Sequence, residues 1–297
     1  DQLLKEIQAG EENRNKGLLK IFFGYAAGVG KTYAMLEAAH MAKQQGIDVV
    51  AGYVEPHAHP KTAALLNGLE VLPTKEVLYN GMILNEFDID MALKRKPQLI
   101  LVDELAHTNA EGCRHAKRYQ DIKELLNAGI DVYTTVNVQH IESLCDTVSS
   151  ITEIVVQERI PDSLFDNADQ VELIDIEPQD LIDRLNTGNV YRQTQAKQVV
   201  ENFFTIENLT ALREIALRRC ADRVNILTEN TRIKNHGDYH TGEHILVCLS
   251  SSPSNAKIIR TAAKMASAFK GEFTALFVET PDFSVMSEEN VKRLRSN

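Results

Sequence analysis

The 297-residue sequence contains little cysteine, no excess of positive charge and no long apolar run. Its four cysteines (Cys113, Cys145, Cys220 and Cys248) are widely spaced, which excludes a disulfide-dense scaffold and a paired-cysteine metal site and indicates reduced thiols in a cytosolic protein. A net charge of −10 without a basic stripe argues against a nucleic-acid partner. Because no apolar run reaches about 18 residues, we expect no membrane-spanning helix in this sequence.

The bulk composition is that of a globular protein. Hydrophobic residues make up 43% and charged residues 25%, and the length suggests about two domains, each able to bury a core. The sequence starts at Asp1 without an initiator Met or a signal peptide, and residues 287–297 have the pattern of a helix cut off midway. We therefore expect a piece of a longer chain.

Residues 24–32 form a glycine-rich phosphate loop pattern, directly after the apolar run 18–23 and before a helical pattern. Such a loop turns backbone N–H groups toward one point, and the N-terminus of the following helix adds partial positive charge there. Lys31 suits the β- and γ-phosphates of a nucleoside triphosphate, and the Thr32 hydroxyl suits Mg²⁺. The nucleotide-binding residues expected in this segment are Gly28, Val29, Gly30, Lys31 and Thr32.

One position of the loop departs from the usual pattern. The motif has Gly or Ala at position 25, whereas this chain has Tyr25, with Gly24 one place early. We expect Tyr25 to point outward from the glycine-flanked turn. Two alternatives stay open: an ordinary glycine turn between a strand and a helix, and a loop that binds no nucleotide because Tyr25 fills the cradle.

A second segment, residues 97–104, reads as a buried parallel strand that ends in two carboxylates. Asp103 stands where phosphate-loop proteins hold Mg²⁺, so Thr32 and Asp103 are the expected metal ligands. Glu104 stands where ATPases place the base that activates water, so it is the candidate catalytic residue. The alternative is that Asp103 merely caps the next helix. No Asn-Lys-x-Asp guanine-reading motif occurs, so adenine is the expected base.

Strand and helix patterns alternate from residue 20 to about 185, which predicts an α/β fold with a parallel sheet and the loop at its carboxyl edge. The expected strands are 20–24, 48–54, 98–103, 131–136, 153–157 and 170–175. The expected helices are 31–45, 60–67, 88–95, 117–127, 138–149 and 178–187. At the end of the fourth strand, Thr134, Thr135 and Asn137 could sense a γ-phosphate.

A helical extension and a second module follow. Residues 208–224 form an amphipathic helix whose arginines (213, 218, 219 and 223) could bind phosphate or a partner's acids, although a solvated face is the favoured reading. We expect a nucleotide-binding domain over 1–228, a polar linker over 229–242 and a partial α/β module over 243–297, with a strand at 244–249, a helix at 254–269 and a strand at 272–279. The linker histidines 236 and 240, and His244, are expected to be ordinary exposed residues, not metal ligands.

Several stretches together resemble the cytoplasmic N-terminal region of the KdpD family of membrane sensor histidine kinases. They are residues 28–39, 52–55, 101–109, 114–121, 131–140 and 208–219. The resemblance covers roughly residues 16–228, and residues 243–297 resemble the start of the universal-stress-protein domain that follows in that family. The family has Pro at positions 27, 111 and 116, Ser at 113 and Gly-Arg at 58–59, which leaves open the rigidity of the loop and any role of position 59.

The resemblance implies a regulatory role in a larger protein. The parent would control potassium-transporter expression in a two-component system, at the cytoplasmic face of the plasma membrane. It would add four transmembrane helices, a dimerisation helix pair with the phospho-accepting His and a separate ATP-binding kinase lobe. The implied partners are this parent's own kinase core and transmembrane region, a second copy in a homodimer, and the cognate response regulator. The kinase core itself is not in this sequence, so its own enzymatic activity is open.

A second ligand signature lies in the last module. Some members of this family carry Ser-x-Ser, twenty residues and Phe-Thr-Ala-x-Tyr, a signature associated with cyclic di-AMP. This chain matches it at Ser250, Ser252, Phe273, Thr274, Ala275 and Phe277, with Phe277 in place of the Tyr. Hydroxyls can bond phosphate or adenine, and a ring can stack on a base. The alternative is a Ser-rich helix cap followed by a strand with buried alternate residues.

Two functions from different classes therefore compete. The favoured one is a sensory module that binds ATP at the loop and cyclic di-AMP at the second site. The alternative is an ATPase whose turnover, through Glu104, is itself the function.

Overall fold

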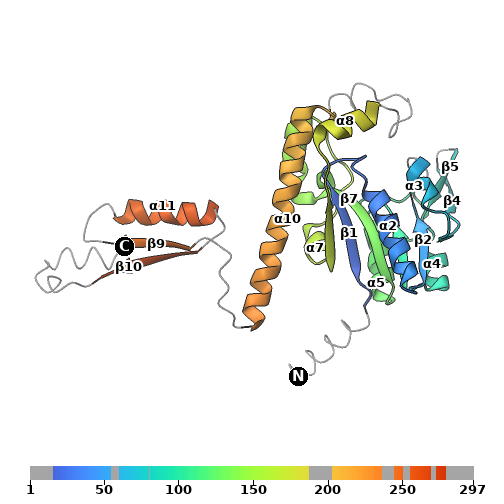
Figure 1. Cartoon of the computed structure of the whole chain (residues 1–297), viewed down its shortest axis with the longest axis horizontal. Coiled ribbons are helices and arrows are strands. Elements are labelled where there is room, and N and C mark those ends of the chain that lie inside the picture. The colour runs from blue at the N-terminus through green and yellow to red at the C-terminus, as the bar shows by residue number, and fades with distance from the viewer. Residues whose placement is uncertain are drawn as a thin grey trace, which may run out of the picture. The chain divides into compact units, whose positions relative to one another are not determined.

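The computed structural model describes residues 16–54, 60–79, 81–186, 203–235, 244–249, 255–268 and 272–278. The chain forms two compact units, Asp1–Ala221 and Asp222–Asn297. The first unit contains a six-stranded sheet in which every pairing is parallel, in the order β3-β2-β6-β7-β1-β8 (Figure 1). Its strands are β1 (Leu19–Gly24), β2 (Val49–Tyr53), β3 (Glu70–Val71), β6 (Leu99–Val102), β7 (Asp131–Asn137) and β8 (Gln170–Ile174).

Alternate residues of the central strands supply two separate cores, one on each face of the sheet. Ile21 and Phe23 of β1 belong to one core, and Phe22 belongs to the other. Strand β6 repeats the division, with Ile100 in the first core and Leu101 in the second. Because both faces are covered, these strands are mostly apolar, as buried parallel strands are; the exception is the half-buried Lys20 of β1.

Helices cover both faces of this sheet. Helix α2 (Lys31–Gln44) packs Met35, Leu36 and Ala39 on one face, and residues of the other helices join the core on the opposite face. Those other helices include α4 (Ile89–Arg95), α5 (Arg118–Asn127), α6 (Cys145–Thr152), α7 (Asp162–Asp166), α8 (Pro178–Asn186) and α10 (Ile206–Asn235). The short helix α3 (Pro60–Ala64) and the 3-10 turns η1 (Val138–His140) and η2 (Glu142–Leu144) complete the set of described helices in this unit. The predicted α/β class with a parallel sheet is confirmed.

Some predicted elements differ from the structure. The strand expected at 153–157 is wrong: Glu153 adopts a left-handed φ of 59° that ends α6, and residues 154–159 form no strand. Their apolar side chains still pack, since Val156 is buried in the first core, which explains the misleading pattern. The helix expected at 138–149 is also wrong in its first half, because that stretch forms the two 3-10 turns and α6 begins only at Cys145.

An antiparallel hairpin, β4 (Lys75–Tyr79) with β5 (Met82–Glu86), was not predicted. It forms a separate two-stranded sheet. Its side chains Leu78, Met82 and Ile83 are exposed, so the hairpin lacks the alternation between buried and exposed positions that marks a strand on a core. Its last residue, Glu86, is buried and belongs to the site described below.

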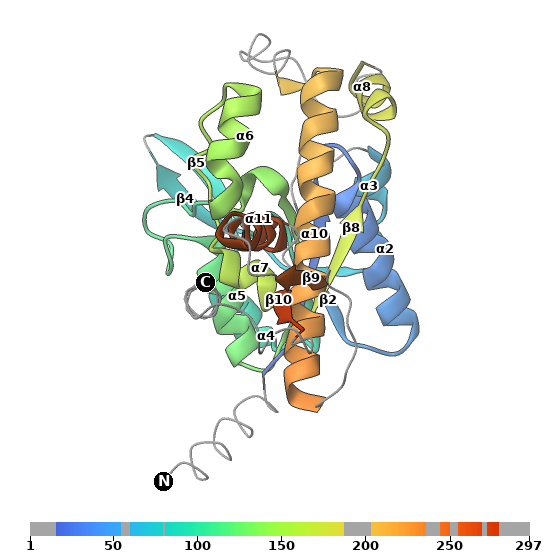
Figure 2. The same ribbon diagram turned by 90° about the vertical axis from the view of Figure 1, so that its left-hand side faces the viewer.

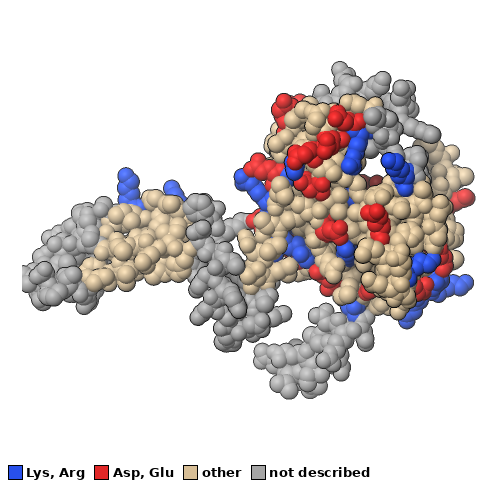
Figure 3. All heavy atoms as spheres, viewed as in Figure 1, with Lys and Arg blue, Asp and Glu red and all other residues tan. Residues whose placement is uncertain are grey.

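Helix α10 runs alongside β8 and α7 (Figure 2) and is fastened there by arginines. Arg213 contacts Asp175 at 2.7 Å and Glu177 at 2.6 Å, both just after β8. Arg219 is buried, contacts Asp166 of α7 at 2.6 Å and lies 4.8 Å from the centre of the Phe165 ring. The solvated-face reading of this helix is therefore wrong at these two positions, whereas Arg218 is exposed. Figure 3 shows that acidic and basic side chains are interspersed over this unit.

The second unit contains one strand–helix–strand module. Strand β10 (Glu272–Phe277) pairs in parallel with β9 (His244–Leu249), and α11 (Asn255–Ala268) connects them. The predicted strand, helix and strand are thus present. Residues 229–235, the first half of the expected linker, continue α10, and histidines 236 and 240 lie outside the described residues. Among the described residues, no helix has the length and apolarity needed to cross a bilayer.

Candidate functional site

The glycine-rich loop, residues 24–30, connects the carboxyl end of β1 to the N-terminus of α2. Gly28 has φ 88° and Gly30 has φ 109°, values in the left-handed region that favours glycine. A Cβ on Gly24 would lie 2.6 Å from Cγ2 of Val29, which is itself buried. The expected residues Gly28, Val29 and Gly30 therefore have the local conformation that a tight turn toward the helix N-terminus requires.

Lys31 is the first residue of α2, and its side chain lies beneath this loop. It is 8% exposed, and its Nζ donates a hydrogen bond to the Ala26 carbonyl oxygen at 3.0 Å. Burial lowers the Lys31 pKa to about 8, although the nearby Asp103 and Glu104 carboxylates act in the opposite direction. The loop thus holds a buried amine whose charge would be stabilised by an anion.

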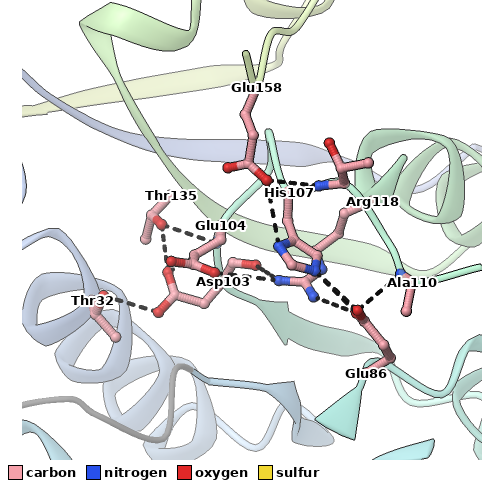
Figure 4. Close-up of polar contacts among 10 residues, drawn as sticks. Thr32, Glu86, Asp103, Glu104, His107, Ala110, Arg118, Thr135 and Glu158 are labelled. Carbon is pink, nitrogen blue, oxygen red and sulfur yellow. Dashed lines mark hydrogen bonds and ion pairs between the residues drawn. The ribbon is translucent and has the colours of Figure 1, made fainter. Parts of the chain in front are cut away.

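Thr32 and Asp103 meet across the carboxyl edge of the sheet (Figure 4). The Thr32 hydroxyl donates to Oδ2 of Asp103 at 3.0 Å, and the Thr135 hydroxyl of β7 donates to Oδ1. Asp103 is 1% exposed. It does not cap the next helix, because α5 begins only at Arg118 and the Asp103 carboxylate accepts from the Glu104 N–H at 3.1 Å. The helix-cap alternative is therefore wrong.

Glu104 lies in a tight turn directly after β6. Its φ is 59°, and its N–H also donates to Oγ1 of Thr135 at 3.2 Å. Its side chain is 45% exposed, with Oε2 at 3.7 Å from Nη1 of Arg118. A non-glycine residue in the left-handed region is uncommon and costs free energy, which the surrounding hydrogen bonds offset. The carboxylate therefore projects from a fixed backbone toward partly open space.

A buried ion-pair network underlies this turn. The Arg118 guanidinium is fully buried, donates to the Asp103 carbonyl oxygen at 3.1 Å and contacts Oε2 of Glu86 at 3.2 Å. Glu86 also accepts from Nε2 of His107 at 3.1 Å and from the Ala110 N–H at 3.0 Å. Burial alone would raise the Glu86 pKa, but the hydrogen bonds from His107 and Ala110 and the charge of Arg118 leave it lowered. Glu86 is thus held as a carboxylate.

This network was missed in the sequence, although a signal was present. Arg118, Ile122 and Leu125 lie on one buried face of α5 at helical spacing, and all are fully buried. Asp121 is also buried on this face, and a charged residue such as Arg118 at a buried position needs a buried partner. The partner, Glu86, is 32 residues away and belongs to the unpredicted hairpin, so the sequence offered no way to name it.

Tyr25 points inward, not outward as expected. It is fully buried in the first core, and its hydroxyl donates to the Ile176 carbonyl oxygen at 3.1 Å. Burial raises the Tyr25 pKa to about 12, and the Asp175 carboxylate acts in the same direction. The ring at the irregular position of the motif is therefore part of the sheet–helix packing.

Strand β7 supplies polar groups between the two halves of the site. Gly24 of β1 is paired in register with Asn137 of β7, which places Asn137 beside the loop. Among the described residues, Oδ1 of Asn137 and Oγ1 of Thr134 are buried side-chain atoms without a hydrogen-bond partner. Buried polar atoms in native proteins are almost always paired, so the unpaired Asn137 oxygen beside the loop favours a ligand that would pair it, whereas Thr134 lies opposite Ile21 in the middle of β1.

His140, in the 3-10 turn after β7, is a further titratable group near this edge. Burial lowers its pKa to about 4; the charge of Lys31 adds to this effect and Glu158 opposes it. The ring is therefore neutral at neutral pH. Sequence reasoning did not single out this residue, because a lone histidine in a turn carries no pattern.

The second predicted site is placed only in part. Ser250 and Ser252 lie outside the described residues. Phe273, Thr274, Ala275 and Phe277 lie on β10, where Phe273 is 38% exposed and the Thr274 hydroxyl is 2.8 Å from Nε2 of His244. The second half of the alternative, a strand with buried alternate residues, is wrong, since Phe273 and Ala275 are both exposed, whereas its first half, the Ser-rich helix cap, lies outside the described residues.

Known proteins match the chain closely. A family model described as "KdpD: Osmosensitive K+ channel His kinase sensor domain" matches residues 15–224. Proteins named sensor protein KdpD from Clostridium acetobutylicum and Escherichia coli are 58% identical over 94% of this chain and 50% identical over 100% of it. A putative sensor protein KdpD from Synechocystis is 45% identical over 91% of the chain and 72% of its own length.

The chain spans about a third of the length of the first two relatives, 31% and 33%. The family model takes in the glycine-rich loop, Asp103, Glu104 and the first part of α10. The chain therefore belongs to the KdpD family, in the part that the family model describes as the sensor domain.

Proposed function

We propose that this chain is the cytoplasmic sensory region of a membrane sensor histidine kinase and that its glycine-rich loop, a phosphate loop, binds ATP as a regulatory ligand. One observation carries the proposal: the adjacent residues Lys31 and Thr32 converge with Asp103, which is 71 residues from Thr32, at the carboxyl edge of one parallel sheet. Ligands of open α/β sheets bind at this edge.

The residues present fit a triphosphate and its metal ion. The Lys31 amine is buried beneath the loop, where phosphate charge would stabilise its protonated form. The unpaired oxygen of Asn137 lies beside the loop and could bond a donor on the ligand or an ordered water. Thr32 and Asp103 would hold Mg²⁺, because a hydroxyl and a carboxylate oxygen 3.0 Å apart are hard oxygen ligands of the kind it prefers. When bound, the ion would neutralise part of the phosphate charge.

The binding test compares two lysines of the same helix. Lys31→Met should weaken ATP binding by at least about tenfold in calorimetry, because a charge-assisted contact to phosphate is lost. Lys43→Met, at the exposed end of α2, is the control and should leave the affinity unchanged. If Lys31→Met folds and binds ATP as the native chain does, the loop is structural and the proposal is rejected. GTP in place of ATP tests the expected preference for adenine.

A second candidate function, ATP hydrolysis, is favoured by Glu104. Its backbone is fixed by two hydrogen bonds, and its carboxylate stands beside the residue proposed to hold the metal. Glu104→Gln should abolish phosphate release while ATP affinity is retained, since the amide cannot accept the proton from water. A native chain that binds ATP without any turnover would reject hydrolysis and leave regulatory binding in place.

We further propose that the second unit binds cyclic di-AMP through Ser250, Ser252, Phe273, Thr274, Ala275 and Phe277. The exposed ring of Phe273 and the neighbouring Thr274 hydroxyl on β10 support this, since one could stack on a base and the other bond a phosphate. Thr274→Val in the full-length kinase should weaken cyclic di-AMP binding in calorimetry. Thr261→Val, on the exposed side of α11, is the control. Equal affinity for all three proteins would reject the second site.

The wider role rests on the relatives. In the full-length protein this region would act on its own kinase core and transmembrane part at the cytoplasmic face of the membrane, in a homodimer. The kinase core would phosphorylate a response regulator that controls potassium-transporter expression. Lys31→Met should therefore change the autophosphorylation of the full-length kinase. If the variant kinase responds to potassium and ATP as the native kinase does, the regulatory role is rejected.

A further inference from the structure

We propose that Arg118 is the positioning residue for Glu104, so that a fully buried guanidinium sets the place of the carboxylate that activates water. The inference rests on the hydrolytic candidate function above and deepens it. The observation that carries it is the joint geometry of Arg118, Glu86 and Glu104 in Figure 4. Arg118 donates to the Asp103 carbonyl oxygen and to Glu86, whereas Lys31 donates to Ala26 of the loop, so the two residues can be tested by separate substitutions.

Three groups other than Glu104 hold the Arg118 guanidinium in place. Its Nη1 donates to the Asp103 carbonyl oxygen, its Nη2 contacts Glu86, and its Cζ atom lies 4.1 Å from the centre of the Tyr53 ring. A planar guanidinium held by a carbonyl, a carboxylate and a ring has little freedom to rotate. The position of its charge relative to β6 is therefore set by the fold.

Glu104 approaches this charge from a backbone that is fixed as well. Its N–H is bonded to Asp103 and Thr135, and its φ of 59° directs the side chain out of the strand direction. The side chain itself is 45% exposed. The Arg118 charge at 3.7 Å from Oε2 restricts its rotation.

The length of this contact matters for the chemistry. At 3.7 Å, the pair is an electrostatic contact and not a short hydrogen bond, so Arg118 orients the carboxylate without donating a short hydrogen bond to it. In hydrolysis, the water oxygen forms a bond to the γ-phosphorus while the bond from that phosphorus to the β,γ-bridging oxygen breaks, and ADP leaves with that electron pair. Glu104 accepts the water proton and afterwards gives it to the phosphate product. Arg118 takes no proton and serves to orient Glu104.

Glu86 explains why Arg118 does not form a closer pair with Glu104. The Glu86 carboxylate is 5% exposed and bonded to His107 and Ala110, so it holds Nη2 of Arg118 in place. The charge of Arg118 is thus shared between a buried carboxylate and an open one. Loss of the Glu86 charge should draw Arg118 and Glu104 into a closer pair, which would withdraw the carboxylate from water.

The experiment uses the whole chain, with two arginines of one segment compared. Arg118→Lys keeps the charge but loses the planar fork, and Arg114→Lys changes an exposed arginine paired with Asp90 and Glu124. We expect Arg118→Lys to lower kcat for phosphate release by at least about tenfold while the calorimetric ATP affinity changes by less than about twofold. Arg114→Lys should leave both unchanged.

A second readout needs no nucleotide. Urea unfolding of a double-mutant cycle measures the coupling between Arg118→Lys and Glu104→Gln. We expect Arg118→Lys to shift the midpoint less when Glu104 is already Gln. Glu86→Gln provides a variant that keeps Arg118, and it should lower kcat with ATP affinity retained.

Each outcome has one meaning. Two results would overturn the inference and leave Arg118 as structural support. One is an Arg118→Lys shift of the urea midpoint that is equal in the native and the Glu104→Gln backgrounds. The other is an Arg118→Lys variant whose kcat is native, or whose ATP affinity falls as much as its kcat. If Arg118→Lys does not fold, Glu86→Gln with native kcat overturns it instead. A native chain that binds ATP without hydrolysis also overturns it while ATP binding stands; a native chain that binds no ATP rejects the proposed function itself.

Discussion

The Tyr25 hydroxyl donates a hydrogen bond to the Ile176 carbonyl oxygen, 151 residues away, at 3.1 Å. The residues on either side of Ile176, Asp175 and Glu177, are the two that Arg213 of α10 binds. The start of the glycine-rich loop and helix α10 are therefore attached to the same three-residue segment after β8. The aromatic ring that interrupts the motif is what provides this attachment.

Tyr25→Phe tests this attachment with almost no change of shape. It should lower the free energy of unfolding by about 0.5–1.5 kcal/mol, because one buried hydrogen bond is lost and the Ile176 carbonyl loses that donor. Tyr33→Phe, on the exposed side of α2, is the matched control and should stay within about 0.5 kcal/mol. Denaturant unfolding measures both. Equal effects of the two substitutions would show that the Tyr25 hydroxyl contributes nothing.

Two adjacent arginines of α10 should differ strongly in their contribution to stability. Arg219→Met removes a buried guanidinium and leaves Asp166 without its partner, so we expect a loss of about 2 kcal/mol, below the range for a fully buried pair because Asp166 keeps some access to water. Arg218→Met removes an exposed pair with Glu214 and should cost less than about 0.5 kcal/mol. A thermal or urea melt of the two variants decides; similar losses would contradict the contacts of Arg219 with α7.

Asp121, a buried residue of α5, and His140 should make the free energy of unfolding depend on pH in opposite directions, so that the two effects partly cancel. Burial raises the Asp121 pKa to about 6, so the folded state binds an extra proton between pH 4 and 6 and stability falls as pH rises through this window. Burial lowers the His140 pKa to about 4, so the unfolded state binds the extra proton between about pH 4 and 6.5 and stability rises with pH there. Each group contributes a slope of up to about 1.4 kcal/mol per pH unit.

Single substitutions separate the two slopes. Relative to the native chain, Asp121→Asn should become more stable as pH rises from 4 to 6, and His140→Gln should become less stable over the same range. Urea unfolding at several pH values gives both differences, in which the other titrating groups cancel. If either difference is flat with pH, that group has no shifted pKa in the folded chain.

Gly24→Ala tests whether close packing around Gly24, as distinct from backbone strain at a glycine, affects both stability and ATP affinity. The added Cβ would lie 2.6 Å from Cγ2 of Val29 and 3.1 Å from Cδ of Lys31, so the loop must shift and stability should fall by about 1–3 kcal/mol. ATP affinity should fall with it if Lys31 binds phosphate. Gly46→Ala is the control: its φ of 86° makes alanine strained, but no atom lies within 4 Å, so only stability should change. Calorimetry and unfolding of both variants test this.

The sequence predicted best those elements whose own residues carry a clear pattern of apolar positions. Strands β1 and β6 were predictable because they are mainly apolar; β1 ends in Gly24, and Asp103 directly follows β6. The hairpin β4–β5 was not, since its exposed Leu78 and Ile83 follow no burial pattern. The strand expected at 153–157 failed for the converse reason: apolar residues there pack on the core without a pairing partner.

The same distinction applies to the site. Lys31, Thr32, Asp103 and Glu104 were predictable because two short motifs carry them. Arg118 and Glu86 were not, because their contact joins an unpredicted hairpin to the start of a helix. The inward direction of Tyr25 also depended on a carbonyl group far along the chain, which no local rule identifies.

Strand β7 lies between β1 and β6, so it acts as a spacer that sets the width of the site. The loop and the carboxylates stand two strand spacings apart, about 9–10 Å, and they are joined across β7 by the Thr32–Asp103 and Thr135–Asp103 contacts. A change in the spacing between β7 and either neighbour would therefore change the separation of Lys31 from Glu104 without altering either residue. Substitutions on this one strand offer a way to tune the proposed nucleotide binding from inside the sheet.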